Sequence, residues 1–345
     1  MNVHDFVTVL REQLPQTAGV AAVAATPCGT GQLADSFRLD LQYRNGAAGP
    51  PSVFVKLPPS DTASARTAQR INAFERESYF YTDLLPRLEI TTPRLLGLAD
   101  FGDAGVGVVL EDLTAVTRPL NQLRDGTPAQ AASVMDQLAG LQAPFWDDVD
   151  AAGGDGRFYN RTQDHIEGLA ERYLQSWHRH GETVGAGLDA AQRHLVDRFG
   201  RRSREWAAGI VGPRTLVHQD LRLDNLLWSD AGGAVLIDWQ TLAFTSPAWD
   251  PAFLLGTALP AELRRQEERT LIARHADALA ARGITGWDRE QAWTEHRRLS
   301  GSVLLAMIAA MAFVAPTERG FAMFASLIER GTRQALDLNL LEFLD

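Results

Sequence analysis

One short segment, residues 215–240, constrains the fold most. It places apolar runs around a polar loop inside a region whose pattern is otherwise helical. Its runs and turn residues predict strand, loop, strand, turn, strand. The loop carries His218, Asp220 and Asn225, and Asp238 directly follows the run AVLI. Since magnesium takes oxygen ligands and keeps few from the protein, these carboxylate and amide groups are candidates for a hard-cation site.

Two other interpretations of these residues stay open. Aspartate and asparagine are common turn formers, so any one of them alone could serve only the local conformation of the loop. A metal-dependent hydrolase using His218, Asp220 and Asp238 would also fit the residue types, with a histidine nitrogen as a ligand. The order of these residues along the chain is more specific than the residue types alone. The pattern His218-x-Asp220-x-x-x-x-Asn225 is followed by Asp238, 18 positions after Asp220.

The part of the chain before this segment has mainly strand character at first. Residues 20–57 contain an apolar run, a Gly29-Thr30-Gly31 break, an alternating stretch around Leu39 and the strand-like SVFVKL, which together predict three antiparallel strands. Residues 61–88 predict one helix, and residues 106–113 return to strand character. A boundary is therefore expected after Leu113.

Beyond Leu113 the pattern is mostly helical. The predicted helices span residues 128–141, 164–180, 189–208, 261–282, 287–315 and 317–341. Several carry large aromatic residues at helical spacing. These could line an acceptor site, but such residues usually pack inside a protein; they are Trp146, Tyr173, Trp177, Trp287 and Trp293.

The length and charge of the chain limit the number of lobes and the kinds of partner to be expected. A chain of 345 residues exceeds the size at which one core stops growing, so two lobes are expected. The net charge of −10 argues against nucleic acid as a partner. The longest uncharged apolar run, residues 302–315, is 14 residues long, short of the ~20 that span a bilayer. With a single cysteine, Cys28, and no secretory pattern at the start, a cytoplasmic protein with no membrane partner is expected.

Lys56 is the only lysine among 33 basic residues. A chain so strongly biased toward arginine would replace lysine at ordinary surface positions at little physical cost. Lysine is a compact point charge, whereas arginine is a planar fork, and the two are not interchangeable in a tight phosphate site. Lys56 therefore marks a position that needs an ammonium group, the alternative being that one lysine survived by accident.

HQDLRLDN followed by VLIDWQ resembles the catalytic loop and metal-binding aspartate of the protein-kinase-like phosphotransferases, in particular the aminoglycoside, choline and ecdysteroid kinase-like branch. The resemblance implies that Asp220 is the catalytic base, that Asn225 and Asp238 are magnesium ligands, and that His218 braces the loop. Arg222 stands where protein kinases place a phosphate-contacting lysine, and phosphate contact and a plain surface arginine are equally open for it.

The same resemblance assigns residues in the first lobe. Lys56 matches the kinase lysine that pairs the α/β-phosphates. Glu77, rather than Glu75, would be its acidic partner. A second set would bind the nucleotide through a short glycine loop and through the backbone of the hinge; it comprises Gly29, Gly31, Glu111 and Leu113.

The predicted fold is α+β, a protein-kinase-like bilobal fold. Its N-lobe, residues 1–113, would have a small antiparallel sheet and one helix, and its C-lobe, residues 114–345, would be mainly α-helical. The implied activity is an ATP- and Mg²⁺-dependent transfer of the γ-phosphoryl group to a hydroxyl of a small molecule: an aminoglycoside, amino alcohol, sterol or macrolide. The alternative is a nucleotide-binding pseudokinase or regulatory module without turnover. The sequence does not indicate an oligomeric state.

Overall fold

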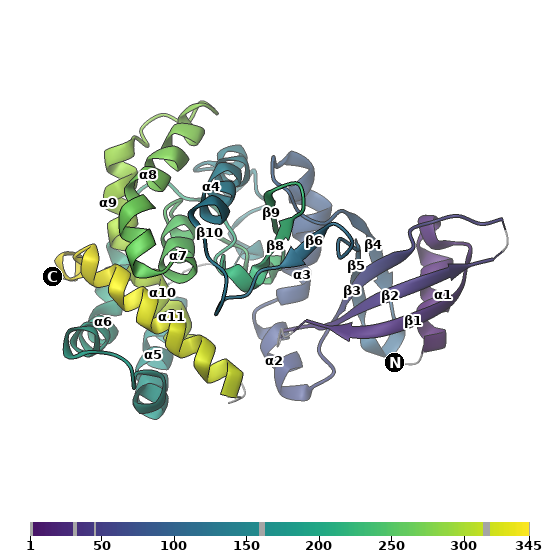
Figure 1. The fold of residues 1–345 in the computed structure, drawn as a ribbon, viewed down its shortest axis with the longest axis horizontal. Helices are drawn as coiled ribbons and strands as arrows, with labels where there is room; N and C mark the ends of the chain where they lie inside the picture. The colour runs from purple at the N-terminus through teal and green to yellow at the C-terminus, as the bar shows by residue number, and fades with distance from the viewer. Residues whose placement is uncertain (1–2, 30–32, 45, 159–162, 313–317, 345) are drawn as a thin grey trace. The chain divides into compact units, whose positions relative to one another are not determined.

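The computed structural model describes residues 3–29, 33–44, 46–158, 163–312 and 318–344. It divides into two compact units, each built from separate stretches of the chain. The first contains residues 1–86, 92–118 and 235–241, and the second contains the remainder. The division expected after Leu113 is a single cut in the sequence. In the structure, residues 87–91 belong to the second unit and residues 235–241 belong to the first. Figure 1 shows the elements of each unit.

A five-stranded sheet organises the first unit, and every neighbouring pair in it is antiparallel. Its order is β1-β2-β3-β5-β4. The strands are β1 (Val20–Cys28), β2 (Asp35–Tyr43), β3 (Ser52–Leu57), β4 (Leu95–Asp100) and β5 (Val106–Glu111). The three expected strands before residue 57 are confirmed, as is the strand that begins at Val106. Strand β4 was not predicted from the sequence, because LLGLAD lacks the alternation that marks a half-buried strand.

The core of this unit lies between the sheet and helix α1 (Val3–Gln13), which packs against β1 and β4 (Figure 1). Phe6 from α1 makes edge contacts with the rings of Phe37 and Phe101. On β3, Val53 and Val55 are buried in this core. Because side chains alternate along a strand, Lys56 points to the opposite face of the sheet.

The helical stretch after β3 is interrupted, so the expectation of one helix over residues 61–88 is wrong. Helix α2 (Thr62–Arg70) ends before Asn72, whose φ of 50° lies in the left-handed region. Helix α3 (Ala73–Tyr79) follows and continues as a π-helical turn over Phe80–Leu84. Asparagine tolerates the left-handed conformation better than most residues, and this lets the chain change direction between the two helices.

Helices dominate the second unit. They are α4 (Pro128–Gln142), α5 (Gln163–Val184), α6 (Ala190–Ala208), α7 (Trp249–Ala258), α8 (Ala261–Ala280), α9 (Arg289–Leu299), α10 (Gly301–Ala310) and α11 (Glu318–Asp337). The predicted helix over residues 287–315 is instead two helices that meet at Ser300. Ser300 keeps helical torsions, but its N–H bonds the carbonyl of Arg297, three residues back, so the α-helical ladder is interrupted there. Helix α7 is fully buried, and it has no polar face that periodicity could detect.

Short strands flank the loop of residues 218–225, as the sequence predicts. Strand β7 (Thr215–Val217) pairs with β10 (Ala243–Thr245), with Leu216 opposite Phe244. Three further strands form a small sheet in the order β6-β8-β9; they are β6 (Thr117–Pro119), β8 (Leu226–Ser229) and β9 (Gly233–Leu236). The order strand, loop, strand, turn, strand is thereby confirmed.

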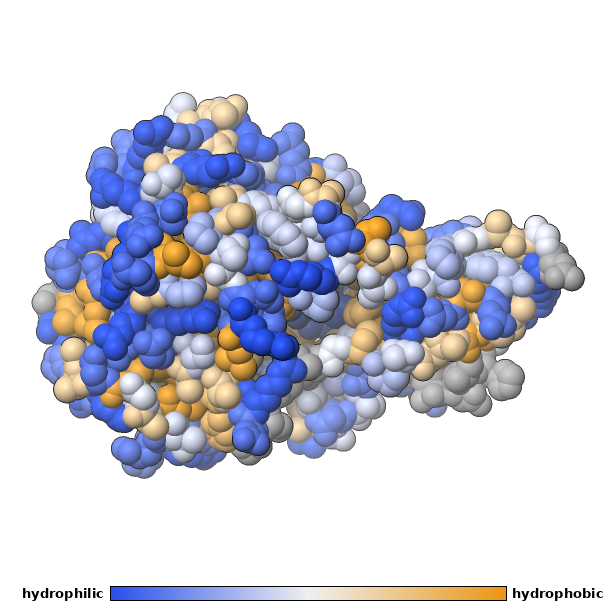
Figure 2. All heavy atoms as spheres, viewed as in Figure 1, coloured by the Kyte–Doolittle hydropathy of each residue, from blue (hydrophilic) through white to orange (hydrophobic). Residues whose placement is uncertain are grey.

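One face of the molecule is shown in Figure 2, coloured by hydropathy. Over the helices of the second unit, hydrophobic residues are scattered among hydrophilic ones on the face shown in Figure 2, which is ordinary for a folded globular chain. Within the described ranges, none of the helices combines the length and the apolar character that a membrane crossing needs.

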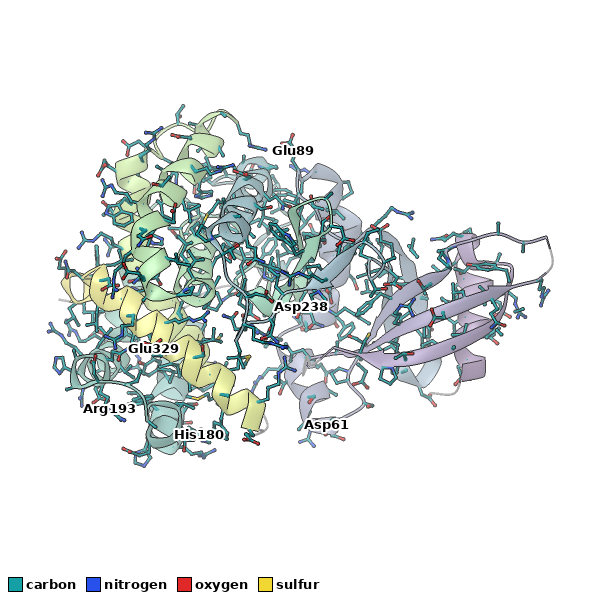
Figure 3. All side chains as sticks on the ribbon, viewed as in Figure 1. Asp61, Glu89, His180, Arg193, Asp238 and Glu329 are labelled. Carbon is teal, nitrogen blue, oxygen red and sulfur yellow. The ribbon has the colours of Figure 1, made fainter. Side chains whose placement is uncertain are left out.

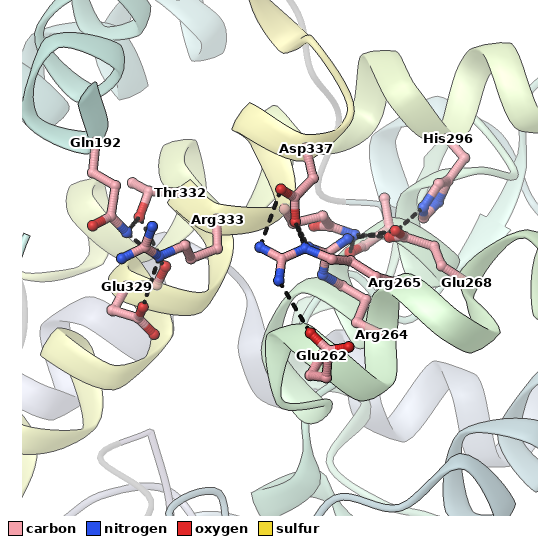
Figure 4. A network of polar contacts seen from close by, with 12 residues as sticks. Gln192, Glu262, Arg264, Arg265, Glu268, His296, Glu329, Thr332, Arg333 and Asp337 are labelled. Carbon is pink, nitrogen blue, oxygen red and sulfur yellow. Dashed lines mark hydrogen bonds and ion pairs between the residues drawn. The ribbon is translucent and has the colours of Figure 1, made fainter. Parts of the chain in front are cut away.

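A buried polar network ties together α8, α9 and α11 (Figure 4). The Glu268 carboxylate accepts hydrogen bonds from Arg264 at 2.5 Å, from His296 at 2.9 Å and from Gln334 at 2.9 Å. Arg264 also pairs with Asp337. Burial works against the charged form of Glu268, yet the His296 and Arg264 contacts lower its pKa below the ordinary value. The carboxylate is therefore stabilised as an anion in the folded chain.

Glu268→Ala should lower the free energy of unfolding by about 3 to 5 kcal/mol, since it removes the shared anion from a buried charged group. Urea unfolding monitored by circular dichroism measures the change. Glu262→Ala is the matched control on the same helix, because its exposed pair with Arg265 should contribute at most about 1 kcal/mol. Equal losses in the two variants would contradict a special role for the buried network.

Candidate functional site

The first unit brings together Lys56, Glu77 and Asp238, three residues singled out in the sequence. Lys56 Nζ lies 2.7 Å from Glu77 Oε2 and 3.0 Å from Asp238 Oδ1. Lys56 is 8% exposed and Glu77 is fully buried. Burial alone would lower the pKa of Lys56, but the charges of Asp238 and Glu77 outweigh it and raise that pKa, so the lysine stays a cation. We call these three residues the lysine cluster.

The elements that carry the cluster explain its geometry. Central strand β3 presents Lys56, with Ser36 of β2 on one side and Val108 of β5 on the other. Helix α3 supplies Glu77, whose Oε1 also accepts the backbone N–H of Trp239 at 3.3 Å. Glu77 therefore holds both the lysine and the chain segment next to Asp238.

Asp238 lies in an unusual backbone conformation, with φ of 72° (labelled in Figure 3). Non-glycine residues at positive φ are uncommon, and they concentrate where surrounding contacts fix the chain at functional sites. The contacts here include the Trp239 ring, which stacks on Phe80 with centroids 3.8 Å apart, and Arg76, which donates to the Gln240 carbonyl at 3.2 Å. The position of the carboxylate is therefore set by its neighbours on both α3 and the loop.

The other residues of this unit that were predicted to bind the nucleotide are Gly29, Gly31, Glu111 and Leu113. Gly29 follows β1 with φ of 83°, a conformation that glycine adopts without strain. Gly31 lies outside the described residues. Glu111, at the end of β5, accepts the N–H of Arg94 through its side chain at 2.8 Å. The Leu113 carbonyl accepts the Val116 N–H at 3.0 Å and so closes a turn. These contacts do not test the hinge roles expected for Glu111 and Leu113, which stay predictions.

In the second unit, the loop of residues 218–225 groups Asp220, Arg222 and Asn225. Asn225 Nδ2 donates to Asp220 Oδ2 at 2.9 Å and to the Asp220 carbonyl at 2.8 Å. Arg222 Nε lies 3.2 Å from Asp220 Oδ1, and its Nη1 donates to Asp224 Oδ2 at 2.8 Å. Because the amide nitrogen of Asn225 faces Asp220, its oxygen is the atom suited to bind a cation.

Side chains of helix α7 hold the backbone of this loop in place. The two oxygens of Asp250 accept the backbone N–H groups of His218 at 2.7 Å and Gln219 at 2.9 Å, and Trp249 Nε1 donates to the Gln219 carbonyl. Gln219 adopts φ of 74° under these contacts. Burial raises the pKa of Asp250 to about 6, although the His218 charge and the two N–H groups act in the opposite direction. Asp250 therefore supports the loop through its two backbone contacts.

Two residues that support the loop were not singled out in the sequence. Gln122 is 1% exposed; its Oε1 accepts the Leu223 N–H, and its backbone N–H donates to Asp224 Oδ1, each at 3.0 Å. Asp224 thus connects Gln122 to Arg222. Asp224 could have been noticed from its place inside HQDLRLDN, whereas Gln122 lies about a hundred residues away, and no sequence signal links it to the loop.

Each unit, taken by itself, contains a predicted magnesium ligand with an oxygen donor. Asp238 offers a carboxylate that is 35% exposed in its side chain, and Asn225 offers an amide oxygen. Across the described ranges, no group of three or more His, Cys, Asp or Glu side chains is arranged to hold a metal ion. His218 is fully buried. Carboxylate and amide oxygens are ligands of the type that magnesium takes.

Comparison with known proteins decides the family. A model of the phosphotransferase enzyme family matches residues 40–293, well over half of the chain. The chain belongs to the phosphotransferase enzyme family. None of the curated protein sequences compared with this phosphotransferase matches it.

Solved structures similar to this phosphotransferase share its fold across nearly the whole chain. The GDP complex of wild-type aminoglycoside 2'-phosphotransferase-IIIa has 16% identity and a TM-score of 0.56, covering 96% of this chain and 99% of that one. Choline kinase from Cryptosporidium parvum Iowa II has 12% identity and a TM-score of 0.56, covering 99% and 94%. A macrolide 2'-phosphotransferase type I has 16% identity and a TM-score of 0.52, covering 89% and 90%. The expected protein-kinase-like α+β fold is confirmed.

Proposed function

We propose that this phosphotransferase moves the γ-phosphoryl group of ATP to a hydroxyl group of a small molecule in the presence of Mg²⁺. The observation that carries the proposal is the lysine cluster, in which the only lysine of the chain is buried against Glu77 and Asp238 at 2.7 and 3.0 Å. Membership of the phosphotransferase family supports the reaction class. Related folds include enzymes named for aminoglycosides, choline and macrolides, which supports a small-molecule acceptor.

Each residue has a proposed role. Lys56 binds the α/β-phosphates, and Glu77 keeps its ammonium in place. Asn225 and Asp238 would hold the magnesium, which when bound would neutralise charge that builds on the phosphoryl oxygens. Gly29, Gly31, Glu111 and Leu113 would contact the nucleotide through backbone groups.

Asp220 acts as the base that orients the acceptor hydroxyl and removes its proton. That step needs hydrogen-bond reach of roughly 2.6 to 3.2 Å in the complex with the acceptor. Asn225 and Arg222 hold the Asp220 carboxylate through its two oxygens. Arg222 would also contact the transferring phosphate, because its guanidinium is a cation beside the base. Phosphoryl transfer depends mainly on such positioning and charge stabilisation, since the transition state is loose.

The acceptor is a hydroxyl compound of the aminoglycoside, amino alcohol, sterol or macrolide type. The aromatic residues considered for its site give little guidance. Tyr173 is fully buried and donates to the Val196 carbonyl, and Trp287 is 3% exposed. The Trp293 ring packs on His296 and on Arg269. These three side chains are therefore used for packing within the second unit.

A screen for acceptor-dependent ADP release tests the proposal. The purified protein with MgATP is presented with hydroxylated antibiotics, amino alcohols, sterols and sugars, and Asp220→Asn serves as the background control. We expect at least one compound to raise ADP release well above that background and to gain a phosphoryl group, detected by mass spectrometry. MgATP binding without turnover across the whole panel would instead support a pseudokinase or regulatory module.

A further inference from the structure

The hydroxyl group of Thr92 contacts the chain on both sides of Asp238. Thr92 Oγ1 donates to the carbonyl of Leu236 at 2.8 Å and accepts the indole Nε1–H of Trp239 at 3.1 Å. Leu236 lies two residues before Asp238, and Trp239 directly follows it. All four residues belong to the first unit. We propose that Thr92 is a positioning residue that sets the orientation of the Asp238 carboxylate for binding a divalent cation; this rests on the metal-binding role proposed for Asp238.

The contacts are specific to a hydroxyl group. A threonine hydroxyl offers one donor and two acceptor lone pairs. The donor goes to Leu236 and one lone pair to Trp239, while Tyr81 Oη lies 3.5 Å away in position to use the second. A methyl group in its place would leave a carbonyl and an indole N–H without this partner in a half-buried region, and such groups are costly to leave unpaired. The loop would have to shift to recover them.

Such a shift would change the direction of the Asp238 carboxylate. Asp238 sits at φ of 72°, so its side-chain direction depends on torsions that the flanking contacts impose. On one side the Leu236 carbonyl accepts the hydrogen bond of the Thr92 hydroxyl. On the other side Trp239 is fixed by Thr92, by Glu77 and by stacking on Phe80. Thr92 thus contacts the chain on both flanks of Asp238.

The experiment measures Mn²⁺ binding directly. Wild type, Thr92→Val and Thr92→Ser are titrated with Mn²⁺ in the presence of a non-hydrolysable ATP analogue, and free Mn²⁺ is followed by electron paramagnetic resonance. Supporting groups around metal ligands typically contribute a factor of about 10 to 100 in metal affinity. We expect Thr92→Val to weaken Mn²⁺ binding by about 10-fold, Thr92→Ser to restore most of it, and binding of the analogue in EDTA to stay unchanged.

Thr17→Val is the matched control. Thr17 is a fully buried threonine of the same unit, and its hydroxyl donates to the Leu10 and Leu14 carbonyls. It should keep the wild-type Mn²⁺ affinity at a temperature where it is folded. Wild-type affinity in Thr92→Val, or an equal loss in Thr17→Val, would overturn the inference. Should Thr92→Val fail to fold, Trp239→Phe removes the indole donor, together with part of the ring volume, and keeps an aromatic ring beside Phe80; unchanged Mn²⁺ affinity in that variant would also overturn the inference.

Failure of the inference is distinct from failure of the proposed function. If wild type binds Mn²⁺ with the analogue and Thr92→Val binds it equally well, the positioning role alone is wrong. If wild type itself binds neither Mn²⁺ nor the analogue, the proposed phosphotransfer is overturned and the role of Thr92 is overturned with it.

Discussion

Asp220→Asn is expected to reduce kcat by a factor of about 100 to 10,000, the range that a positioned general base contributes. The substitution keeps the size of the side chain, and its amide oxygen can still accept from Asn225, so the loop should keep its shape. It removes the group proposed to take the proton of the acceptor hydroxyl. Acceptor-dependent ADP release measures kcat, and calorimetric titration with MgATP should show an unchanged affinity for the nucleotide.

Two comparisons make that result specific. Asp220→Ala should lose the same activity while retaining MgATP binding. Asp230→Asn alters an exposed aspartate in the turn between β8 and β9, and it should leave kcat unchanged. Normal turnover in either Asp220 variant would exclude this residue as the base.

Lys56→Arg should lower kcat/KM by about 100-fold to 1,000-fold, the range found when a preorganised charge-stabilising donor is lost. The formal charge is preserved, so the effect would come from shape. The Lys56 ammonium fits within 2.7 Å of Glu77 and 3.0 Å of Asp238 in a buried place, where a larger planar guanidinium must displace one of its partners. Steady-state kinetics with the acceptor found in the screen measures the change.

The control for this prediction is Arg11→Lys, which replaces an arginine by a lysine. Arg11 lies on helix α1, and its Nε donates to the Val20 carbonyl. It should have little effect on kcat/KM, and both variants should be checked for folding by circular dichroism. Lys56→Met is less informative, because it leaves Glu77 buried without its cation and is expected to destabilise the chain by about 3 to 5 kcal/mol. Undiminished kcat/KM in Lys56→Arg would contradict the role given to the lone lysine.

The sequence carried enough information to indicate the family and the fold class. The order of His218, Asp220, Asn225 and Asp238 pointed to a phosphotransferase, and the family match agrees with it. The pairing of Lys56 with Glu77, rather than Glu75, is seen in the structure. The family prediction succeeded because each residue type has a narrow set of chemical uses at that spacing, so a coincidence of several is informative.

Other features depend on contacts that no local pattern encodes. The break at Asn72 follows from a single residue in the left-handed region, within a stretch whose apolar spacing is helical throughout. Helix α7 is buried on every side, so its periodicity is hidden. Thr92 and Gln122 act through residues far away in sequence, and their types, threonine and glutamine, are common in loops and helices of any protein. Only the folded backbone shows where their polar atoms are directed.

The grouping of residues 235–241 with the sheet has a consequence for biosynthesis. The amino-terminal sheet emerges from the ribosome early, but Phe80, Glu77 and Thr92 cannot make their contacts with Trp239 until that residue is synthesised. The nascent chain must therefore keep that surface open while roughly the first two thirds of the polypeptide is synthesised, although domains generally fold as units in order of synthesis. A fragment ending at residue 118 would expose the same aromatic surface permanently, so a separately expressed version of this unit needs residues 235–241 joined back to it.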